Sequence, residues 1–204
     1  MIVIVDYGLG NVRAFESLYK KIDIPCIVAS SAVELGQASK IILPGVGAFD
    51  FAMDSLLRSG MRKQLDHMVV DLGTPVLGVC VGMQMMSTHS DEGSLPGFGW
   101  IDGCVKRFDF SGSSTPTDVP HMGWNNVKPV SSSGLFEQLD DHSRFYFLHS
   151  FYFSCTSQDS VIATTNYGGD FASAVEKDNV FGVQFHPEKS HGWGVRILEN
   201  FARM

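Results

Sequence analysis

The sequence lacks a surplus of basic residues, and it lacks any long hydrophobic run. Its 15 Lys and Arg residues are outnumbered by 22 Asp and Glu residues, which gives a formal net charge of −7. This charge argues against nucleic acid as the main partner, because phosphate backbones bind basic surfaces. No apolar stretch reaches the roughly 18 uncharged residues that a membrane-spanning helix needs, and Asp6 precedes any basic segment of a signal peptide. We therefore expect a cytoplasmic protein that binds neither nucleic acid nor membrane.

Cysteines are few and widely spaced. The four, Cys26, Cys80, Cys104 and Cys155, form no C-x-x-C pair of the kind that holds zinc or exchanges disulfides. In a cytoplasmic protein we expect Cys26, Cys104 and Cys155 to be buried, inert thiols. Nothing in the sequence indicates a metal or an organic cofactor. Cys80 differs from the others because glycines surround it.

The length and the order of the expected elements predict the fold. At roughly 100–200 residues per domain, the 204 residues favour one domain spanning 1–204. In the first half, short apolar runs typical of buried strands alternate with segments of helical periodicity, which predicts βαβ units. The expected strands lie at 1–6, 26–28, 41–43 and 76–79, and the expected helices at 11–21, 51–57 and 61–70, with Asn11 as an N-cap.

The second half contains shorter runs rich in β-branched and aromatic residues. We expect strands at 100–108, 144–148, 161–165, 172–175 and 180–185, several of them antiparallel, and a last helix at 193–202. The most loop-like segment is 111–117, a connection within one domain. The predicted fold class is therefore α/β, with a mostly parallel central sheet flanked by helices and with additional antiparallel strands.

Glycines frame Cys80 directly after a predicted buried strand. Gly78-Val79-Cys80-Val81-Gly82 matches the strand, tight turn and helix of a nucleophile elbow, with cysteine in place of serine. The two glycines remove side chains that would clash at such a strained turn. A helix that starts near Val81 places N–H groups beside the sulfur and favours the thiolate. The alternative is a core cysteine in a glycine-rich strand end.

A thiolate nucleophile normally works with a base. Among the seven histidines, His186 ends a predicted strand and is followed by Pro187 and Glu188. Residues i and i+2 of an extended segment share a face, so Glu188 can hold the ring of His186 through the nitrogen that does not transfer the proton. A histidine at a strand end beside proline is otherwise a common surface feature, so this motif alone leaves its role open.

A loop with two glycines follows the strand expected at 41–43. In Gly45-Val46-Gly47, exposed backbone N–H groups can stabilise the oxyanion of a tetrahedral intermediate. An ordinary turn is the alternative.

Taken together, these three motifs resemble the class I (triad) glutamine amidotransferases, in which Cys, His and Glu occur in this chain order. Further segments are similar to the glutaminase subunits of imidazole glycerol phosphate synthase, at 44–49, 82–84, 120–125, 147–150 and 182–190. The similarity covers nearly the whole chain. It implies a flavodoxin-like amidotransferase fold and a catalytic triad of Cys80, His186 and Glu188.

The resemblance also implies the chemistry and the pocket. Cys80 attacks the side-chain carboxamide of L-glutamine, His186 passes a proton to the departing ammonia, and water hydrolyses the glutamyl thioester. The implied oxyanion donors are the N–H group of Val81 and the loop of Gly45, Val46 and Gly47. The implied substrate-binding residues are Gly47, Gln84, His149, Ser150 and Phe151, with phenylalanine where the family often has tyrosine. His121 lies in one of the similar segments without an assigned role.

The chain leaves no room for a second active site that would consume the ammonia. Ammonia released into neutral water is mostly protonated and loses its nucleophilicity, so we expect direct transfer to a partner. The resemblance implies a heterodimer with a separate (βα)₈-barrel cyclase/synthase subunit, which makes imidazole glycerol phosphate in histidine biosynthesis. Trp124, Asn125 and Lys189 match segments near that subunit interface. The free subunit is expected to be nearly inactive.

Three other interpretations stay open. A paralogous subunit could supply ammonia for sugar modification in surface-polysaccharide biosynthesis, and the segments 91–93 and 191–194 and Val81 resemble such paralogues at least as well. A stand-alone cysteine hydrolase could cleave γ-glutamyl bonds with the same triad, and it would turn over without a partner. A catalytically silent binding module is least favoured, because all three triad positions are intact.

Overall fold

The centre of the molecule is an eight-stranded sheet, seen in a computed structural model that describes residues 1–111 and 118–204. Five strands run parallel in the order β2-β1-β3-β4-β13, and β12, β11 and β8 continue the sheet antiparallel. The predicted α/β class is therefore confirmed. The bounds are β1 Ile2–Val5, β2 Cys26–Ala29, β3 Lys40–Gly45, β4 Val76–Cys80, β8 Lys128–Pro129, β11 Val161–Asn166, β12 Asp170–Lys177 and β13 Val180–Val183.

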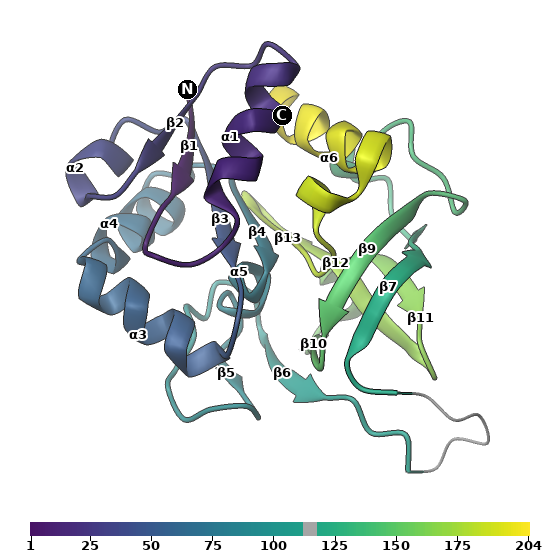
Figure 1. The fold of residues 1–204 in the computed structure, drawn as a ribbon. Coiled ribbons are helices and arrows are strands. Elements are labelled where there is room, and N and C mark those ends of the chain that lie inside the picture. Colours follow the sequence, from purple (N-terminus) through teal and green to yellow (C-terminus); the bar gives the residue numbers. More distant parts are fainter. Residues whose placement is uncertain (112–117) are drawn as a thin grey trace.

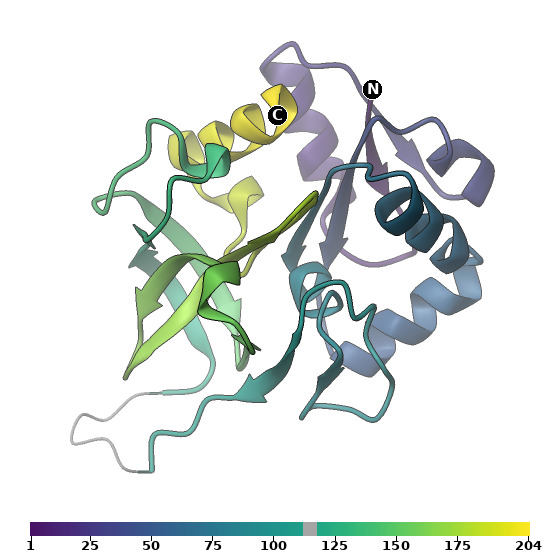
Figure 2. The ribbon, with the colours of Figure 1, turned by 180° about the vertical axis from the view of Figure 1, so that it is seen from behind.

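Helices cover both faces of this sheet (Figures 1 and 2). The helix that connects β1 to β2, α1 (Val12–Lys21), lies beside α6 (His191–Arg203) on one face. On the other face lie α3 (Phe49–Ser59) and α4 (Arg62–Asp66), which connect β3 to β4, while α2 (Ala32–Leu35) connects β2 to β3. Right-handed crossovers that run in opposite directions along a sheet place their helices on opposite faces. Within the described residues, no helix combines the length and apolar character that crossing a bilayer requires.

The parallel strands are buried because helices exclude water from both of their faces. Every residue of β1 and β4 is buried, and Ile4, Ile42 and Leu77 have no exposed surface. Each such aliphatic side chain stabilises the fold by about 1.5–3 kcal/mol relative to an exposed one. This burial explains why these strands are continuous apolar runs in the sequence rather than alternating ones.

Two smaller sheets stand beside the antiparallel strands. One pairs β7 (His121–Asn126) with β9 (Arg144–His149), and the other contains β10 (Phe151–Cys155), β6 (Gly103–Arg107) and β5 (His89–Ser90). Aromatic rings pack between the sheets: Phe171 of β12 contacts Phe147 and Phe108, with ring centroids 6.0 and 5.3 Å apart. β7 and β10 are missing from the sequence-based expectations, because polar residues interrupt β7 and a single residue separates β10 from β9.

Several local expectations are wrong. Residues 100–102 belong to no strand, because β6 begins at Gly103. The helix expected at 61–70 continues beyond α4 as a π-helical turn, η1 (His67–Asp71). Asn11 occupies the N-cap position of α1, but its side chain makes no capping hydrogen bond. Of the loop expected at 111–117, residues 112–117 lie outside the described part. Short 3₁₀ turns are η2 (Gly134–Phe136), η3 (Gln158–Ser160) and η4 (Pro187–Lys189).

The three cysteines outside the elbow are more accessible than expected. Cys26, Cys104 and Cys155 are free and half-buried rather than buried. Their positions explain this, because Cys26 starts the edge strand β2, Cys104 lies in the small β10-β6-β5 sheet, and Cys155 ends β10. Burial nevertheless raises the pKa of the Cys155 thiol to about 11, which keeps this thiol protonated at neutral pH.

Candidate active site

Cys80 lies at the sharp turn between β4 and α5 (Val81–Gln84). Its backbone has a φ of 56° and a ψ of −113°, a conformation that costs a residue other than glycine about 1–3 kcal/mol. A Cβ atom on Gly78 would lie 2.6 Å from the carbonyl oxygen of Gly82, and one on Gly82 would overlap the carbonyl group of Leu43. The strand, turn and helix of the expected elbow are therefore present. The helix has only four residues, however, so its dipole is weaker than the sequence argument assumes.

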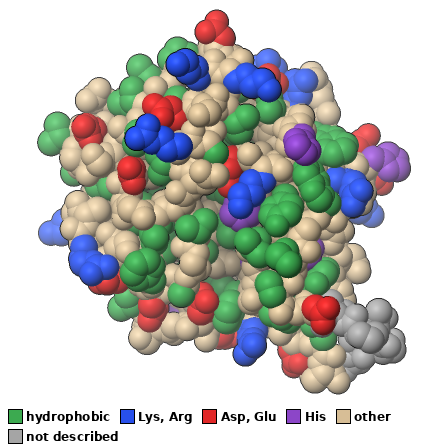
Figure 3. All heavy atoms as spheres, viewed as in Figure 1, with side chains coloured by type: hydrophobic (Ala, Val, Ile, Leu, Met, Phe, Trp, Pro, Cys, Tyr) green, Lys and Arg blue, Asp and Glu red, His purple; other side chains and the backbone are tan. Residues whose placement is uncertain are grey.

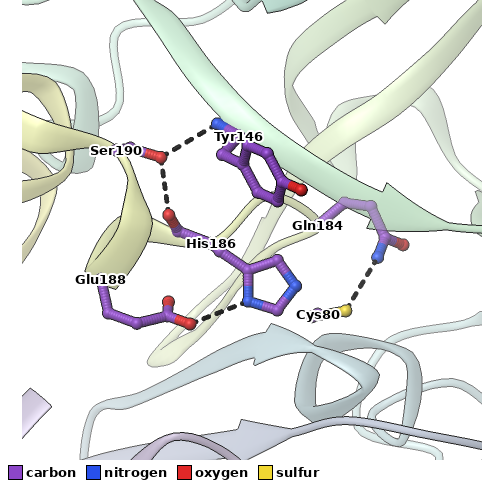
Figure 4. Close-up of polar contacts among 6 residues, drawn as sticks. All are labelled: Cys80, Tyr146, Gln184, His186, Glu188 and Ser190. Carbon is purple, nitrogen blue, oxygen red and sulfur yellow. Dashed lines mark hydrogen bonds and ion pairs between the residues drawn. The ribbon is translucent and has the colours of Figure 1, made fainter. Parts of the chain in front are cut away.

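His186 and Glu188 come from the segment that follows β13. His186 Nδ1 lies 2.9 Å from Glu188 Oε1, and the two side chains are 4% and 1% exposed. The expected contact is present, but the segment is extended only at His186, because Pro187 and Glu188 already belong to the turn η4. Figure 4 shows the imidazole ring of His186 between Glu188 and the sulfur of Cys80.

The backbone of His186 is tied to strand β9. Its N–H group donates to the carbonyl of Tyr146 at 2.9 Å. The hydroxyl of Ser190 donates to the carbonyl of His186 at 2.6 Å and accepts the N–H group of Tyr146 at 3.0 Å. These bonds fix the position of the ring relative to the elbow, although the two segments are far apart in the sequence.

Local electrostatics hold a proton on His186. Burial by itself lowers the pKa of this imidazole, but hydrogen bonds and charge interactions with Cys80 and Glu188 outweigh burial and raise the pKa above its usual value. A cationic ring between a sulfur atom and a carboxylate is the charge arrangement that activates a cysteine nucleophile.

A cavity of about 310 Å³ opens beside Cys80. Most of the expected site residues line it, namely Val46, Gly47, Cys80, Val81, Gln84, His149, Ser150, Phe151, His186 and Lys189, together with Glu92, Pro120 and Leu148. Four expected residues do not line it: Gly45, Glu188, Trp124 and Asn125. Small-molecule pockets range over roughly 300–1,000 Å³, so this one suits a compound of amino-acid size. In the part of the chain that the structure describes, no group of three or more His, Cys, Asp or Glu side chains could hold a metal ion.

The glycine loop after β3 forms one side of the cavity. Gly45 is the last residue of β3 and pairs in register with Cys80. A side chain on Gly45 would collide with the backbone of Val81 and Gly82, so this glycine lets the loop approach the elbow. Val46 and Gly47 are the loop residues that line the cavity, and Gly47 has a φ of 87°.

A chain of hydrogen bonds forms the facing wall. Gln84 Nε2 donates to the carbonyl of Phe151 at 2.9 Å and to Gln184 Oε1 at 3.0 Å. His149 Nδ1 donates to the same carbonyl at 2.8 Å, and His149 Nε2 lies 3.1 Å from His121 Nδ1. Burial lowers the pKa of His149 to about 3 and that of His121 to about 4, so both rings are neutral. His121, to which the sequence assigns no role, thus supports the cavity wall through His149.

Two polar residues at the site are missing from the sequence-based set. Gln184 is fully buried, and its Nε2 lies 3.7 Å from Cys80 Sγ. Glu92 lines the cavity, and its Oε2 accepts the N–H group of Phe49, the first residue of α3, at 2.8 Å. Gln184 lies two residues before His186, the same spacing that relates Glu188 to His186 on the other side. No local pattern identifies Glu92, because a loop brings it to α3 by tertiary packing.

An exposed apolar patch lies next to the cavity. Met122 and Trp124 of β7, which are 66% and 37% exposed, pair in register with Leu148 and Tyr146 of β9. We call these four residues the β7–β9 patch. Figure 3 shows hydrophobic side chains gathered over these strands. Leu148 belongs both to the patch and to the cavity lining, so the patch reaches the cavity.

The three residues expected at a partner interface have different surroundings. Trp124 belongs to the β7–β9 patch and stacks on His191, with ring centroids 5.1 Å apart. Lys189 lines the cavity, and its Nζ lies 5.7 Å from the ring centre of Tyr146. Asn125 is half-buried, and its Nδ2 lies 3.2 Å from His121 Nε2. Asn125 therefore supports the hydrogen-bonded wall through His121.

Known proteins resemble this chain over its full length. A protein from Bdellovibrio bacteriovorus named imidazole glycerol phosphate synthase subunit HisH is 56% identical, and the alignment covers 100% of both chains. A protein of the same name from Leptospira interrogans is 48% identical, and one from Pseudomonas aeruginosa named imidazole glycerol phosphate synthase subunit HisH 2 is 43% identical, each with 100% of both chains covered.

Solved structures share the fold. One described as glutamine amidotransferase aligns with a TM-score of 0.77 at 18% identity, covering 100% of this chain and 98% of that one. PurLQS from Thermotoga maritima aligns with a TM-score of 0.73 at 17% identity, covering 99% and 97%. The profile of the family described as "Glutamine amidotransferase class-I" matches residues 3–204. The chain thus belongs to the class-I glutamine amidotransferase family and is a glutamine amidotransferase enzyme.

Proposed function

We propose that this chain is the glutaminase subunit of an imidazole glycerol phosphate synthase. In this proposal it hydrolyses L-glutamine to glutamate and ammonia through Cys80, His186 and Glu188, and it delivers the ammonia to a separate (βα)₈-barrel cyclase/synthase subunit in histidine biosynthesis. The observation that carries the proposal is the His186 ring held between the Glu188 carboxylate and the Cys80 sulfur beside a cavity. The names of the relatives support the assignment to this synthase.

The proposed reaction has two stages. The Cys80 thiolate attacks the side-chain carbonyl carbon of glutamine, and the carbonyl electron pair moves to the oxygen. When the tetrahedral intermediate collapses, the C–N bond breaks and the His186 cation gives its proton to the departing nitrogen, so ammonia leaves. The neutral ring then takes a proton from water, which attacks the thioester and releases glutamate and the thiolate. Glu188 holds the ring through Nδ1 in both stages.

Backbone donors stabilise the oxyanion in this mechanism. Val81 is the first residue of α5, and an N–H group at that position has no acceptor within its own helix. A second donor comes from Val46 or Gly47, which line the cavity next to the elbow. Removal of one such donor costs about 2.7–4 kcal/mol of transition-state stabilisation in enzymes of this kind.

The remaining lining residues suit the backbone groups of an amino acid. The Glu92 carboxylate attracts the α-ammonium group, and Lys189 attracts the α-carboxylate. Gln84, His149 and Ser150 bound the space for the side chain. Phe151 acts through its backbone, because its carbonyl accepts hydrogen bonds from Gln84 and His149. A ring without a hydroxyl group is sufficient for that role.

The β7–β9 patch is the proposed docking surface for the barrel subunit. It is apolar, it reaches the cavity through Leu148, and it lies beside Lys189. An interface here would cover the cavity and keep ammonia from bulk water. The word subunit in the names of the relatives supports such an assembly.

The test separates glutamine use from ammonia use. The Cys80→Ala variant, assayed in complex with the barrel subunit, should lose glutamine-dependent synthesis and retain synthesis from added ammonium salts. Cys104→Ala, which changes a half-buried cysteine on β6, is the matched control and should retain both activities. Loss of both activities in Cys80→Ala, or retention of both, would contradict the proposed division of labour.

A second measurement addresses the competing assignments. The partner that co-purifies with the chain should be a (βα)₈-barrel subunit, and the complex should form imidazole glycerol phosphate from the ribonucleotide substrate and glutamine. A partner that aminates a sugar would favour the surface-polysaccharide paralogue. A free chain that hydrolyses glutamine as fast as the complex would favour a stand-alone γ-glutamyl hydrolase.

A further inference from the structure

A buried amide contacts the nucleophile on the side that the triad leaves open. Gln184 has no exposed surface, and its Nε2 donates to Cys80 Sγ at 3.7 Å (Figure 4). We propose that Gln184 is a further catalytic residue of the glutaminase reaction, whose amide N–H group stabilises the anionic sulfur of Cys80. This inference rests on the proposed function, because it assumes that Cys80 acts as the nucleophile.

Two hydrogen bonds made by Gln84 fix which end of the Gln184 amide faces the sulfur of Cys80. A backbone carbonyl can only accept, so the bond to the carbonyl of Phe151 identifies the Gln84 nitrogen as a donor. The same nitrogen donates to Gln184 at 3.0 Å, so the Gln184 oxygen faces Gln84. The other end of the Gln184 amide, its NH₂ group, therefore faces Cys80. The orientation of the Gln184 amide is thus set by the carbonyl of Phe151, to which it is linked through Gln84.

The backbone that carries Gln184 is also held in place. Its N–H group donates to the carbonyl of Ser173 on β12 at 2.9 Å. Gln184 directly follows β13 and is separated from His186 by a single residue. The segment 184–186 thus presents two donors to the Cys80 sulfur, the neutral amide of Gln184 and the cationic ring of His186.

The N–H dipole of Gln184 is expected to stabilise the anionic sulfur of Cys80 strongly. The sulfur lies in a buried site, where a donor acts more strongly than in water. The helix α5 after Cys80 has only four residues, which limits what its N-terminus contributes. In the proposed mechanism, negative charge is present on sulfur before attack and returns to it when the thioester is hydrolysed. Gln184 stabilises the sulfur at both points, and the effect should appear in the rate of turnover more than in substrate affinity.

The first test measures the reactivity of the sulfur directly. Alkylation of Cys80 by iodoacetamide is followed from pH 5 to pH 10, with peptide mass spectrometry to separate Cys80 from the other three cysteines. The Gln184→Met variant keeps the side-chain length and removes the donor. Its half-maximal alkylation should move up by about one pH unit, since one hydrogen bond to a charged group corresponds to about a tenfold effect or more. An unchanged midpoint would overturn the proposal.

A second variant covers the case in which Gln184→Met fails to fold. Gln184→Glu keeps an oxygen toward Gln84 but places a second oxygen, in place of the NH₂ group, against the sulfur. The midpoint of Cys80 alkylation should move upward further than in Gln184→Met, because a carboxylate repels the thiolate. A midpoint at the wild-type value in this variant would also overturn the proposal.

The turnover rate of Gln184→Met and a matched control variant distinguish an effect on catalysis from an effect on folding. In complex with the barrel subunit, Gln184→Met should lower kcat for glutamine by about 10- to 100-fold with KM within about threefold, while ammonia-dependent synthesis is retained. Asn200→Leu removes another buried amide, which donates to the carbonyls of Leu135 and Glu137 away from the cavity. It should lower the melting temperature and leave the alkylation midpoint unchanged. Wild-type kcat in Gln184→Met would contradict the inference about Gln184 only, whereas glutaminase activity in Cys80→Ala would contradict the proposed function itself.

Discussion

The two walls of the cavity are built in different ways. The wall that carries Cys80 consists of backbone, in which Cys80 has a positive φ and Gly78 and Gly82 leave no room for a Cβ atom. The facing wall consists of side chains joined by hydrogen bonds, among them Gln84 and His149. The first wall depends on close packing between parallel strands, and the second depends on donor and acceptor directions. We therefore expect changes in the first wall to affect folding, and changes in the second to affect pH dependence and turnover.

The largest effect should come from adding one carbon atom to the backbone wall. In Gly82→Ala, the new methyl group would overlap the carbonyl of Leu43, which belongs to the buried strand β3 and cannot move aside. The free energy of unfolding should fall by about 3 kcal/mol or more, at the upper end of overpacking effects. Urea denaturation measures the loss. Gly192→Ala in α6, where a methyl group meets no atom within 4 Å, is the control and should be neutral or stabilising. Equal stability of the two variants would contradict the packing argument.

The next largest effect should come from removing the charge of Glu188, whose carboxylate contacts the ring of His186. Glu188→Gln keeps the shape of the side chain but removes the charge that helps to raise the pKa of His186. We expect kcat for glutamine to fall by about 100-fold or more with little change in KM, because a neutral amide does not stabilise the protonated ring and favours the wrong tautomer. Steady-state kinetics of the complex provide the measurement, with ammonia-dependent synthesis as the internal control. A kcat within a factor of about three of the wild-type value would remove Glu188 from the triad.

The sequence predicts the backbone wall better than the wall that faces it. The glycines around Cys80 follow from steric rules that act over five residues, and the apolar runs of β1 and β4 follow from burial on both faces. The facing wall joins residues from α5, β7, β9 and β10, and no local pattern encodes those contacts. Gln84 and His149 enter the expected site only by family resemblance, while Glu92 and the link from His121 to His149 need tertiary structure.

Even the correct contact between His186 and Glu188 has a different local cause from the expected one. The i, i+2 rule assumes an extended backbone, whereas the segment turns into η4 directly after His186. Pro187 favours that turn, because proline is well accommodated in a first turn. The spacing of His186 and Glu188 predicts that they meet, but only the structure shows the turn that brings them together.

A smaller effect should appear in the pH dependence of stability. The pKa values of His149 and His121 are lowered to about 3 and about 4, so the unfolded chain binds protons first as the pH falls below 6.5. Their contribution to stability is therefore complete above pH 6.5 and is lost toward pH 4, by up to about 1.4 kcal/mol per pH unit for each ring. Protonation of His149 would also place an N–H group against the N–H group of His121. The raised pKa of His186 has the opposite sign, because its contribution is lost as the pH rises above 6.5.

The substitution His121→Gln tests this assignment. The free energy of unfolding, from urea denaturation between pH 7 and pH 4.5, should show a shallower acid dependence than in the wild type, by up to about 1.4 kcal/mol per pH unit. His142→Gln, which changes an exposed histidine, should leave the dependence as it is. An acid dependence that is the same in all three proteins would show that His121 does not contribute to it.

The smallest effect is expected at Phe151, where the facing wall uses backbone rather than a side chain. The carbonyl of Phe151 accepts hydrogen bonds from Gln84 Nε2 at 2.9 Å and from His149 Nδ1 at 2.8 Å. Phe151 is the first residue of β10, so its carbonyl is held by the strand and does not depend on the side chain. Phe151→Tyr should therefore leave kcat unchanged and alter KM for glutamine by less than about threefold, the size of one weak exposed hydrogen bond. Initial-rate kinetics of the complex measure both constants. A tenfold fall in KM would show that a hydroxyl group at this position takes part in glutamine recognition, and that side chains control this part of the wall after all.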